Sequence, residues 1–377
     1  MKMIMKTIMK TWIFLGALLS MTTPSPAQTV TVPFDSGRWK WEAVESRVED
    51  HLGRKSLYLK GGIATVADTH FLNGWIEFDL ALPDDRGFMG GVWRVQDTKN
   101  YEEFYLRPHQ SGNPDATQYT PVINGLPGWQ LYHGGRYTVP VTYKYEEWTH
   151  VKILFAGDLA EIYIGDMETP VLFVNGLKRR PEAGRVGVSA ADFAPAHFAN
   201  FSYTISDSPP IQGVPGPPEF VPVGVISSWS VSDVLRESTL EKKMSLSHED
   251  VAARSWTRLE TERSGLANLA RVHGIDLWRN TVFVKKVIVS SQEQTRRLDF
   301  GFSDRVRVYL NGRLLFRGDD TYRSRDYRFL GSIGYFDSLF LPLVKGENEL
   351  LLAVSEDGGG WGIQARLEDL AGLTLQD

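Results

Sequence analysis

The chain has 377 residues, a net charge of −5 and no cysteine, and its length suits two domains better than one. The lack of cysteine excludes disulfides, thiolate metal sites and cysteine nucleophiles. The acidic balance argues against nucleic acid as a partner, because that binding needs clustered lysine and arginine. The short basic run at 178–180 is interpreted as a solvated turn.

Residues 1–27 have the pattern of a secretory signal peptide. Three lysines precede a short apolar segment at 12–19, and small residues then lead to a cleavage site after Ala27. The apolar segment is too short for a permanent anchor, and no other run is long enough to cross a membrane. We therefore expect a secreted or periplasmic bacterial protein with no membrane span after cleavage. A buried N-terminal helix is the alternative, and three lysines without an acid fit it less well.

A proline-rich segment at 206–224 predicts a linker between two blocks, 29–205 and 225–377. In the first block, short runs such as 75–80 and 148–155 alternate apolar and polar residues between turn signals, which predicts a sandwich of strands. The second block begins with a short helix predicted after the capping residue Ser247, and then turns to strands.

Each block resembles a known family. The first closes with the strand 198–203, Phe-Ala-Asn-Phe-Ser-Tyr, and its order of strands resembles concanavalin A-like (laminin-G-like) jelly rolls. The second contains Gly-Glu-Asn-Glu-Leu at 346–350 and Gly-Gly-Gly-Trp-Gly at 358–362, which resembles galactose-binding-like modules. The resemblance implies an all-β protein of two jelly-roll β-sandwiches, and it implies carbohydrate as the partner.

The richest chemistry lies in the segment 101–109. If this segment is a strand, its odd-numbered side chains share one face, while Phe104 and Leu106 face the core. That face would carry two aromatic rings, an acid, a guanidinium and an imidazole, a set that suits a sugar. The predicted ligand-binding residues are therefore Tyr101, Glu103, Tyr105, Arg107 and His109.

Further residues are expected near this face because they flank it in sequence. They are Arg94, Gln118, Tyr119 and the segment 129–132, beginning with Trp129. The alternative interpretation is a ladder of ion pairs among Arg94, Glu103 and Arg107, with no ligand.

The acidic residues of the first block raise a separate possibility, which is catalysis. Jelly-roll glucanases use a Glu-x-Asp-x-x-Glu strand, but here Glu77 and Asp79 are followed by Leu82, so these two acids are interpreted as exposed strand residues. The 3-keto-glycoside hydrolase or lyase domains have a similar layout, although their Asn-Ser-Gly strand is replaced here. In such an enzyme Glu103 and His109 would be the acid/base or metal-ligand candidates.

In the second block Trp361 is the candidate for stacking on a sugar, with Tyr322 nearby, although a core plug is the favoured interpretation. Calcium is possible in the loops at 318–322 and 357–358, whose Asp and Gly residues turn chemistry explains equally well.

The sequence as a whole predicts an exported carbohydrate-recognition protein that binds an oligo- or polysaccharide on the first sandwich without catalysis. The alternatives are a glycoside hydrolase or 3-keto-glycoside hydrolase or lyase, and a protein-binding adhesion module.

Overall fold

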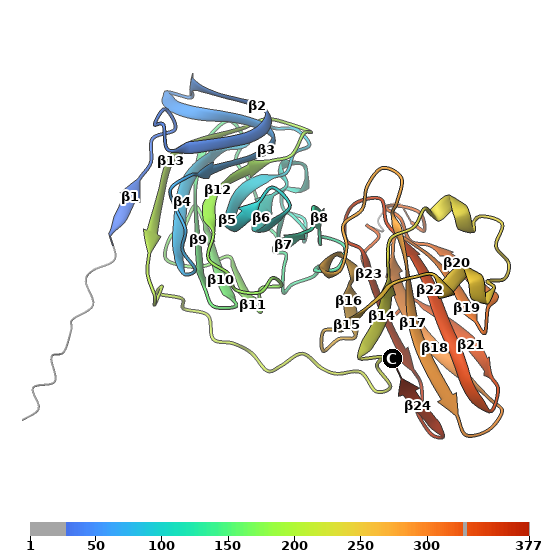
Figure 1. Ribbon diagram of the computed structural model, residues 1–377. Coiled ribbons are helices and arrows are strands. Elements are labelled where there is room, and N and C mark those ends of the chain that lie inside the picture. The colour runs from blue at the N-terminus through green and yellow to red at the C-terminus, as the bar shows by residue number, and fades with distance from the viewer. Residues whose placement is uncertain (1–27, 327–329, 377) are drawn as a thin grey trace, which may run out of the picture.

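The computed structural model describes residues 28–326 and 330–376, so the expected signal peptide at 1–27 lies outside the described residues. The described chain is almost entirely strand, and Figure 1 shows its strands in two groups, β1–β13 and β14–β24. The all-β prediction is confirmed.

The first group forms one thirteen-stranded sheet, in the order β11-β10-β9-β4-β13-β3-β12-β5-β6-β7-β8, with β1 added to β13 and β2 to β3. The sheet curls on itself, and apolar side chains that alternate along its strands fill the space between its layers. Its strands are β1 Thr29–Thr31, β2 Trp39–His51, β3 Arg54–Val66, β4 Gly74–Ala81, β5 Met89–Asp97, β6 Asn100–Leu106, β7 Thr117–Ile123, β8 Leu126–Pro127, β9 Trp148–Ala156, β10 Leu159–Ile164, β11 Leu172–Asn175, β12 Arg185–Ala190 and β13 Ala196–Ile205.

The second group forms a seven-stranded sheet, β15-β14-β17-β22-β19-β20 with β24 on β17, and a four-stranded sheet, β16-β23-β18-β21. A second apolar core joins the two sheets. The strands are β14 Ser228–Ser232, β15 Trp256–Glu260, β16 Leu266–Asn268, β17 Thr281–Ser290, β18 Gln294–Ser303, β19 Arg305–Leu310, β20 Arg313–Asp319, β21 Asp337–Leu343, β22 Gly346–Ser355, β23 Gly362–Leu367 and β24 Leu373–Gln376.

Helical structure is short. The α-helix α1 spans His248–Ala252, and Ser247 precedes it as predicted, with the Asp250 carboxylate accepting a 2.8 Å hydrogen bond from the Ser247 backbone N–H. Single 3-10 turns occupy three further places. They are Pro108–Gln110, Glu237–Leu240 and Leu269–Arg271. The segment that carries α1 covers the outer face of the seven-stranded sheet, where Leu246 joins a small apolar cluster.

Residues 206–224 contain no helix or strand, yet they are held against the first sandwich. The buried Glu161 carboxylate accepts hydrogen bonds from the backbone N–H of Gln212 at 3.0 Å and of Gly213 at 2.8 Å. The Tyr163 hydroxyl donates to the same carboxylate at 2.8 Å. This anchor fixes the start of the connection between the two groups of strands.

The two sandwiches contact each other directly. Glu262 of the second sandwich accepts a 2.7 Å hydrogen bond from the Tyr132 hydroxyl and forms a 2.7 Å ion pair with Lys178 of the first. The interpretation of 178–180 as a solvated turn was therefore wrong for Lys178, whose side chain is only 14% exposed. Sequence could not show this, because the carboxylate that pairs with Lys178 comes from the other block.

In the described residues we find no helix with the length and apolar character needed to cross a membrane.

Candidate functional site

Strand β6 separates its side chains between two environments. Phe104 and Leu106 are buried in the core, whereas Tyr101, Glu103 and Tyr105 lie on the other face of the sheet. Arg107 and His109 continue this side beyond the end of the strand. All five predicted residues line one cavity of about 710 Å³, which we call the β6 groove. Its volume lies within the range of small-molecule sites.

Glu103 is a half-buried acid in the wall of the β6 groove. Its carboxyl group accepts a 2.7 Å hydrogen bond from the Ser189 hydroxyl on β12. Burial raises the pKa of Glu103 to about 7, because the charged form loses hydration there. At neutral pH the group is therefore divided between a carboxylic acid, which can donate a hydrogen bond, and a carboxylate, which only accepts.

Arg107 is only 5% exposed, and several hydrogen bonds hold its guanidinium in place. Its guanidinium donates to the Asp115 backbone oxygen at 2.6 Å and to the Tyr105 hydroxyl at 3.0 Å, and it also contacts the Gln118 side-chain oxygen. Burial raises the pKa of Tyr105 to about 12, so its hydroxyl remains protonated. A preorganised cation and a phenol hydroxyl thus stand side by side at the groove.

Gln118 does not line the groove, but it bonds two side chains that do. It is 2% exposed and lies behind the lining residues, where its amide donates to the backbone oxygens of Trp129 at 2.8 Å and Tyr132 at 2.6 Å. Since its carbonyl oxygen also meets Tyr105 and Arg107, Gln118 positions these two side chains relative to the segment 129–132. It is a positioning residue rather than the ligand contact that was predicted.

His109 lies in the wall of the groove beside Phe88. Its ring centroid lies 5.3 Å from that of Phe88, which also contacts the ring of Tyr105. Desolvation and the nearby cations Arg86 and Arg107 lower the pKa of His109. The imidazole is therefore neutral at pH 7 and offers both a donor and an acceptor.

One part of the groove wall is formed jointly by the two sandwiches. Trp129 of the first sandwich and Tyr322 of the second line it, with ring centroids 6.4 Å apart at an interplanar angle of 76°. Leu330 and Gly358, also from the second sandwich, line the groove as well. The sequence alone suggests that Tyr322 lies near Trp361, and only the docking of the sandwiches brings it to Trp129.

Arg94 does not lie at the groove, so that prediction was wrong. It is 1% exposed, its Nε donates to the Leu72 backbone oxygen at 2.9 Å, and burial lowers its pKa. The register of β5 against β6 shifts after Trp93, and Arg94 adopts a φ of +51°. This irregularity interrupts the alternation and turns the side chain into the core. With Arg94 removed from the face, the predicted ladder of ion pairs with Glu103 and Arg107 is also absent.

Tyr119 is likewise in the core rather than near the groove. It is fully buried opposite Phe104, and its hydroxyl donates to the carboxylate of Glu102 at 2.7 Å. The strand β7 has no clear alternation of apolar and polar residues, so the sequence could not tell the side of Gln118 from that of Tyr119.

Trp361 is fully buried, and its indole N–H donates to the Val354 backbone oxygen at 3.0 Å, so it cannot stack on a sugar. The favoured interpretation as a core plug agrees with this position. The preceding glycines have a different role: a Cβ on Gly359 would collide with the side chains of Gln130 and Trp129. The glycine run lets the first sandwich dock closely against the second.

Glu77 and Asp79 lie outside the groove, but Asp79 is not exposed as predicted. It is 8% exposed and bonds His150 Nδ1 at 2.6 Å and Asn200 at 2.7 Å. Hydrogen bonds from His150 to Asp79 and then Glu77 raise the pKa of this histidine to about 9. The strand β9 supplies His150 opposite Asp79, a pairing that local sequence does not reveal.

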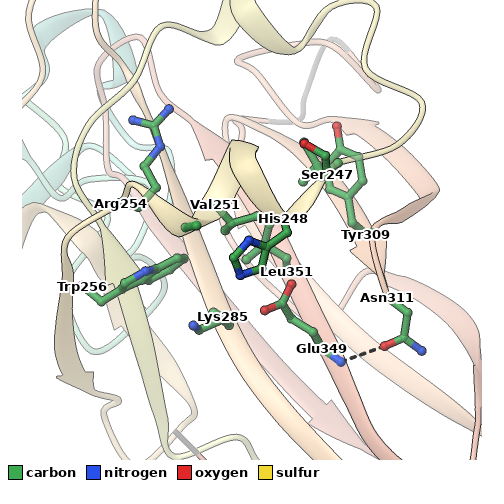
Figure 2. A pocket seen from close by; sticks show the side chains of 13 residues that line it. Ser247, His248, Val251, Arg254, Trp256, Lys285, Tyr309, Asn311, Glu349 and Leu351 are labelled. Carbon is green, nitrogen blue, oxygen red and sulfur yellow. Dashed lines mark hydrogen bonds between the residues drawn. The ribbon is translucent and has the colours of Figure 1, made fainter.

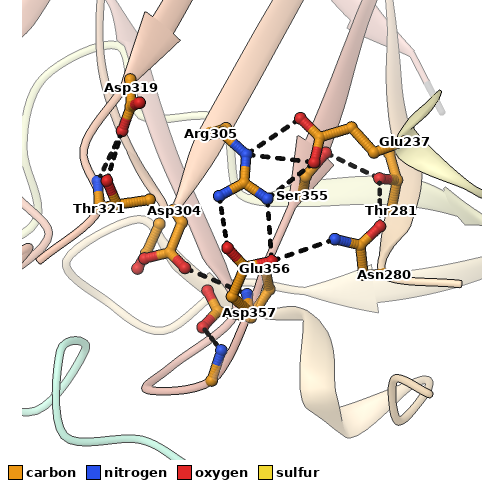
Figure 3. A network of polar contacts seen from close by, with 12 residues as sticks. Glu237, Asn280, Thr281, Asp304, Arg305, Asp319, Thr321, Ser355, Glu356 and Asp357 are labelled. Atoms are coloured by element: carbon orange, nitrogen blue, oxygen red, sulfur yellow. Dashed lines mark hydrogen bonds and ion pairs between the residues drawn. The ribbon is translucent and has the colours of Figure 1, made fainter. Parts of the chain in front are cut away.

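The two loops considered for calcium do meet in space (Figure 3). The Asp357 backbone N–H donates to the Asp304 carboxylate at 3.1 Å, and the Asp320 backbone N–H donates to the Asp304 backbone oxygen. The Asp357 carboxylate itself is held by Arg305 at 2.7 Å. Within residues 28–326 and 330–376, no group of three or more acidic or histidine side chains has an arrangement that could hold a metal ion.

Comparison with known proteins gave similarities to solved structures alone. No protein-family profile and no curated protein matches the chain. The carbohydrate-binding module CBM66 from Bacillus subtilis is 18% identical, with 44% of this chain and 94% of that one covered, at a TM-score of 0.34. The xylan β-1,4-xylosidase from Bacillus halodurans is 18% identical over 46% of this chain and 38% of that one, at 0.33. The β-glucanase from Bacillus licheniformis is 8% identical over 48% and 100%, also at 0.33. With TM-scores this low we draw no functional conclusion from these likenesses.

Proposed function

We propose that this protein binds a glycan in the β6 groove. The observation that supports the proposal is that alternate positions of one strand, Tyr101, Glu103 and Tyr105, line a cavity together with Arg107 and His109. Aromatic rings offer contact to the apolar faces of pyranoses, while the acid, guanidinium and imidazole offer hydrogen bonds to hydroxyls.

The composition of the groove favours an extended saccharide over a single sugar. Its lining includes two separate aromatic groups, Phe88 beside His109 and Trp129 beside Tyr322, together with polar side chains. A chain of sugar units can contact both aromatic groups at once, so an oligo- or polysaccharide is the partner we propose. The protein would meet it outside the cell, as the sequence of residues 1–27 predicts.

Affinity electrophoresis of the mature protein through gels containing plant, algal or bacterial polysaccharides tests this proposal. Retardation by at least one polysaccharide is expected, and Tyr101→Ala should weaken the binding about fivefold, since one aromatic contact is worth about 1 kcal/mol. The matched control is Tyr58→Ala, which removes a half-buried tyrosine of β3 that does not line the groove. No retardation in any gel, or equal loss in both variants, would overturn the assignment.

A second candidate is cleavage of a glycoside, and one observation favours it. Glu103 lies in the groove with a pKa raised to about 7, which is the property that a general acid needs near neutral pH. Asp115 and Asp192 also line the groove and could supply the second carboxylate that glycoside hydrolysis requires.

Product analysis separates the two candidates. Incubation of the retained polysaccharide with wild-type protein should release no reducing or 3-keto sugar if the protein only binds. Release that Glu103→Gln abolishes, while gel retardation persists, would establish an enzyme instead.

A further inference from the structure

A second cavity, of about 400 Å³, lies on the outer face of the seven-stranded sheet of the second sandwich, beside α1 (Figure 2). We call it the α1 cavity. Its lining combines an apolar floor with several polar side chains, and it shares no residue with the β6 groove. The residues that matter here are Val251, Trp256, Lys285, Tyr309, Glu349 and Leu351.

Strand pairing brings two opposite charges to this cavity. Lys285 on β17 lies opposite Leu351 on β22, and Val287 lies opposite Glu349. Lys285 and Glu349 are therefore diagonal neighbours on the outer face, at a spacing of about 7–8 Å between backbones. No ion pair joins them in the part of the chain that the structure describes, and Figure 2 shows both beside the same space.

The polar groups of Lys285, Trp256 and Glu349 make few contacts with other described residues. The Lys285 ammonium lies 4.3 Å from the centroid of the Trp256 ring, and this is its one contact of a polar kind among the described residues. In the same residues, neither the Trp256 indole N–H nor the Glu349 carboxylate has a hydrogen-bond partner. By contrast, Arg254 at the rim is paired with Asp233 at 2.9 Å.

The chemistry of this lining selects a neutral ligand. Glu349 would repel a ligand with a negative charge, and Lys285 would repel a ligand with a positive charge. Sugar hydroxyls can accept from Lys285 and the Trp256 indole while donating to Glu349. The partly exposed side chains of Val251 and Trp256 offer apolar surface to a pyranose ring. We propose that the α1 cavity is a second binding site, and that it takes one neutral pyranose unit.

Two separate sites on one chain would strengthen attachment to a polysaccharide through effective concentration, without any new contact. The α1 cavity nevertheless stands on its own observations, so its test is arranged to be independent of the β6 groove.

The test follows the indole N–H resonance of Trp256 in the full-length mature protein, assigned by its disappearance in Trp256→Phe. Glucose, galactose, mannose and xylose are titrated separately, first with wild type and then with Tyr101→Ala, which impairs the groove. A saturable shift with at least one sugar is expected in both proteins. Glu349→Gln should weaken the binding about tenfold, as expected for the loss of a charged hydrogen bond.

The matched control is Glu347→Gln, which makes the same change at an exposed position on the same strand outside the cavity lining. Its binding should equal that of wild type. Absence of a saturable shift with all four sugars, or equal weakening by both Gln variants, would overturn the site. Tighter binding of galacturonate or galactosamine than of galactose would overturn the assignment of a neutral ligand.

Discussion

The side-chain amide of Gln130 in the first sandwich donates a 3.3 Å hydrogen bond to the carboxylate of Asp304 in the second. Both residues are buried, and the Gln130 backbone N–H adds a 2.9 Å bond to the Gly359 oxygen. This contact, together with the pair formed by Lys178 and Glu262, fixes the part of the β6 groove that Trp129 and Tyr322 line. The geometry of the proposed site therefore depends on how the sandwiches dock.

The glycine run gives a direct test of this docking. Gly359→Ala places a methyl group against Gln130 and Trp129, so we expect a loss of about 2–5 kcal/mol from strain and overpacking together. Gly358→Ala is the matched control, because Gly358 has a similar φ of +143° but open space around its Cβ position. It should show the strain alone, about 1–3 kcal/mol. Chemical denaturation of both variants measures the difference, and equal losses would contradict the docking role of Gly359.

The buried acids beside this contact predict a pH dependence of stability. Burial raises the pKa of Glu356 above its ordinary value of 4.5, with the nearby Asp304 as the next cause. Because the folded state favours the protonated acid, the stability that Glu356 contributes is complete below pH 4.5. It is lost at up to about 1.4 kcal/mol per pH unit as the pH rises toward the folded pKa.

Glu356→Gln removes this titration. We therefore expect the variant to gain stability relative to wild type as the pH rises from about 4.5 to 7, measured by urea denaturation at several pH values. Glu347→Gln, at an exposed position of β22, is the control and should leave the slope unchanged. Parallel pH profiles for wild type and Glu356→Gln would refute the prediction.

Much of the β6 groove could be predicted from sequence because it depends on one local rule. Period-two geometry sorts Tyr101, Glu103 and Tyr105 from Phe104 and Leu106 without reference to any other strand. The rule fails where the backbone departs from it, as the bulge at Arg94 shows.

Other features depend on partners that are distant in sequence. The roles of the glycine run and of Lys178 follow from contacts between the sandwiches, and the α1 cavity follows from the pairing of β17 with β22. Local sequence carries no signal for either kind of contact. Trp256 and Glu349 were therefore missed, although both lie in segments whose strand character could be predicted.

The buried position of Trp361 predicts a structural effect without a direct effect on glycan binding. Trp361→Ala should cost about 3–5 kcal/mol, because it removes a fully buried indole and its hydrogen bond to Val354. At a temperature where the variant remains folded by circular dichroism, its retardation in polysaccharide gels should equal that of wild type. A folded variant that no longer binds would show that Trp361 contributes to the site after all.

The connection between the sandwiches gives the last prediction. Glu161→Gln weakens the acceptor for the backbone N–H groups of Gln212 and Gly213, so the segment 206–224 should leave the first sandwich more often. Since proteases cleave the detached form, we expect limited proteolysis within 206–224 to accelerate up to about tenfold. Glu182→Gln, at an exposed position away from this contact, serves as the control and should be cleaved at the wild-type rate. If Glu161→Gln is also cleaved at that rate, the carboxylate is not what holds the connection in place.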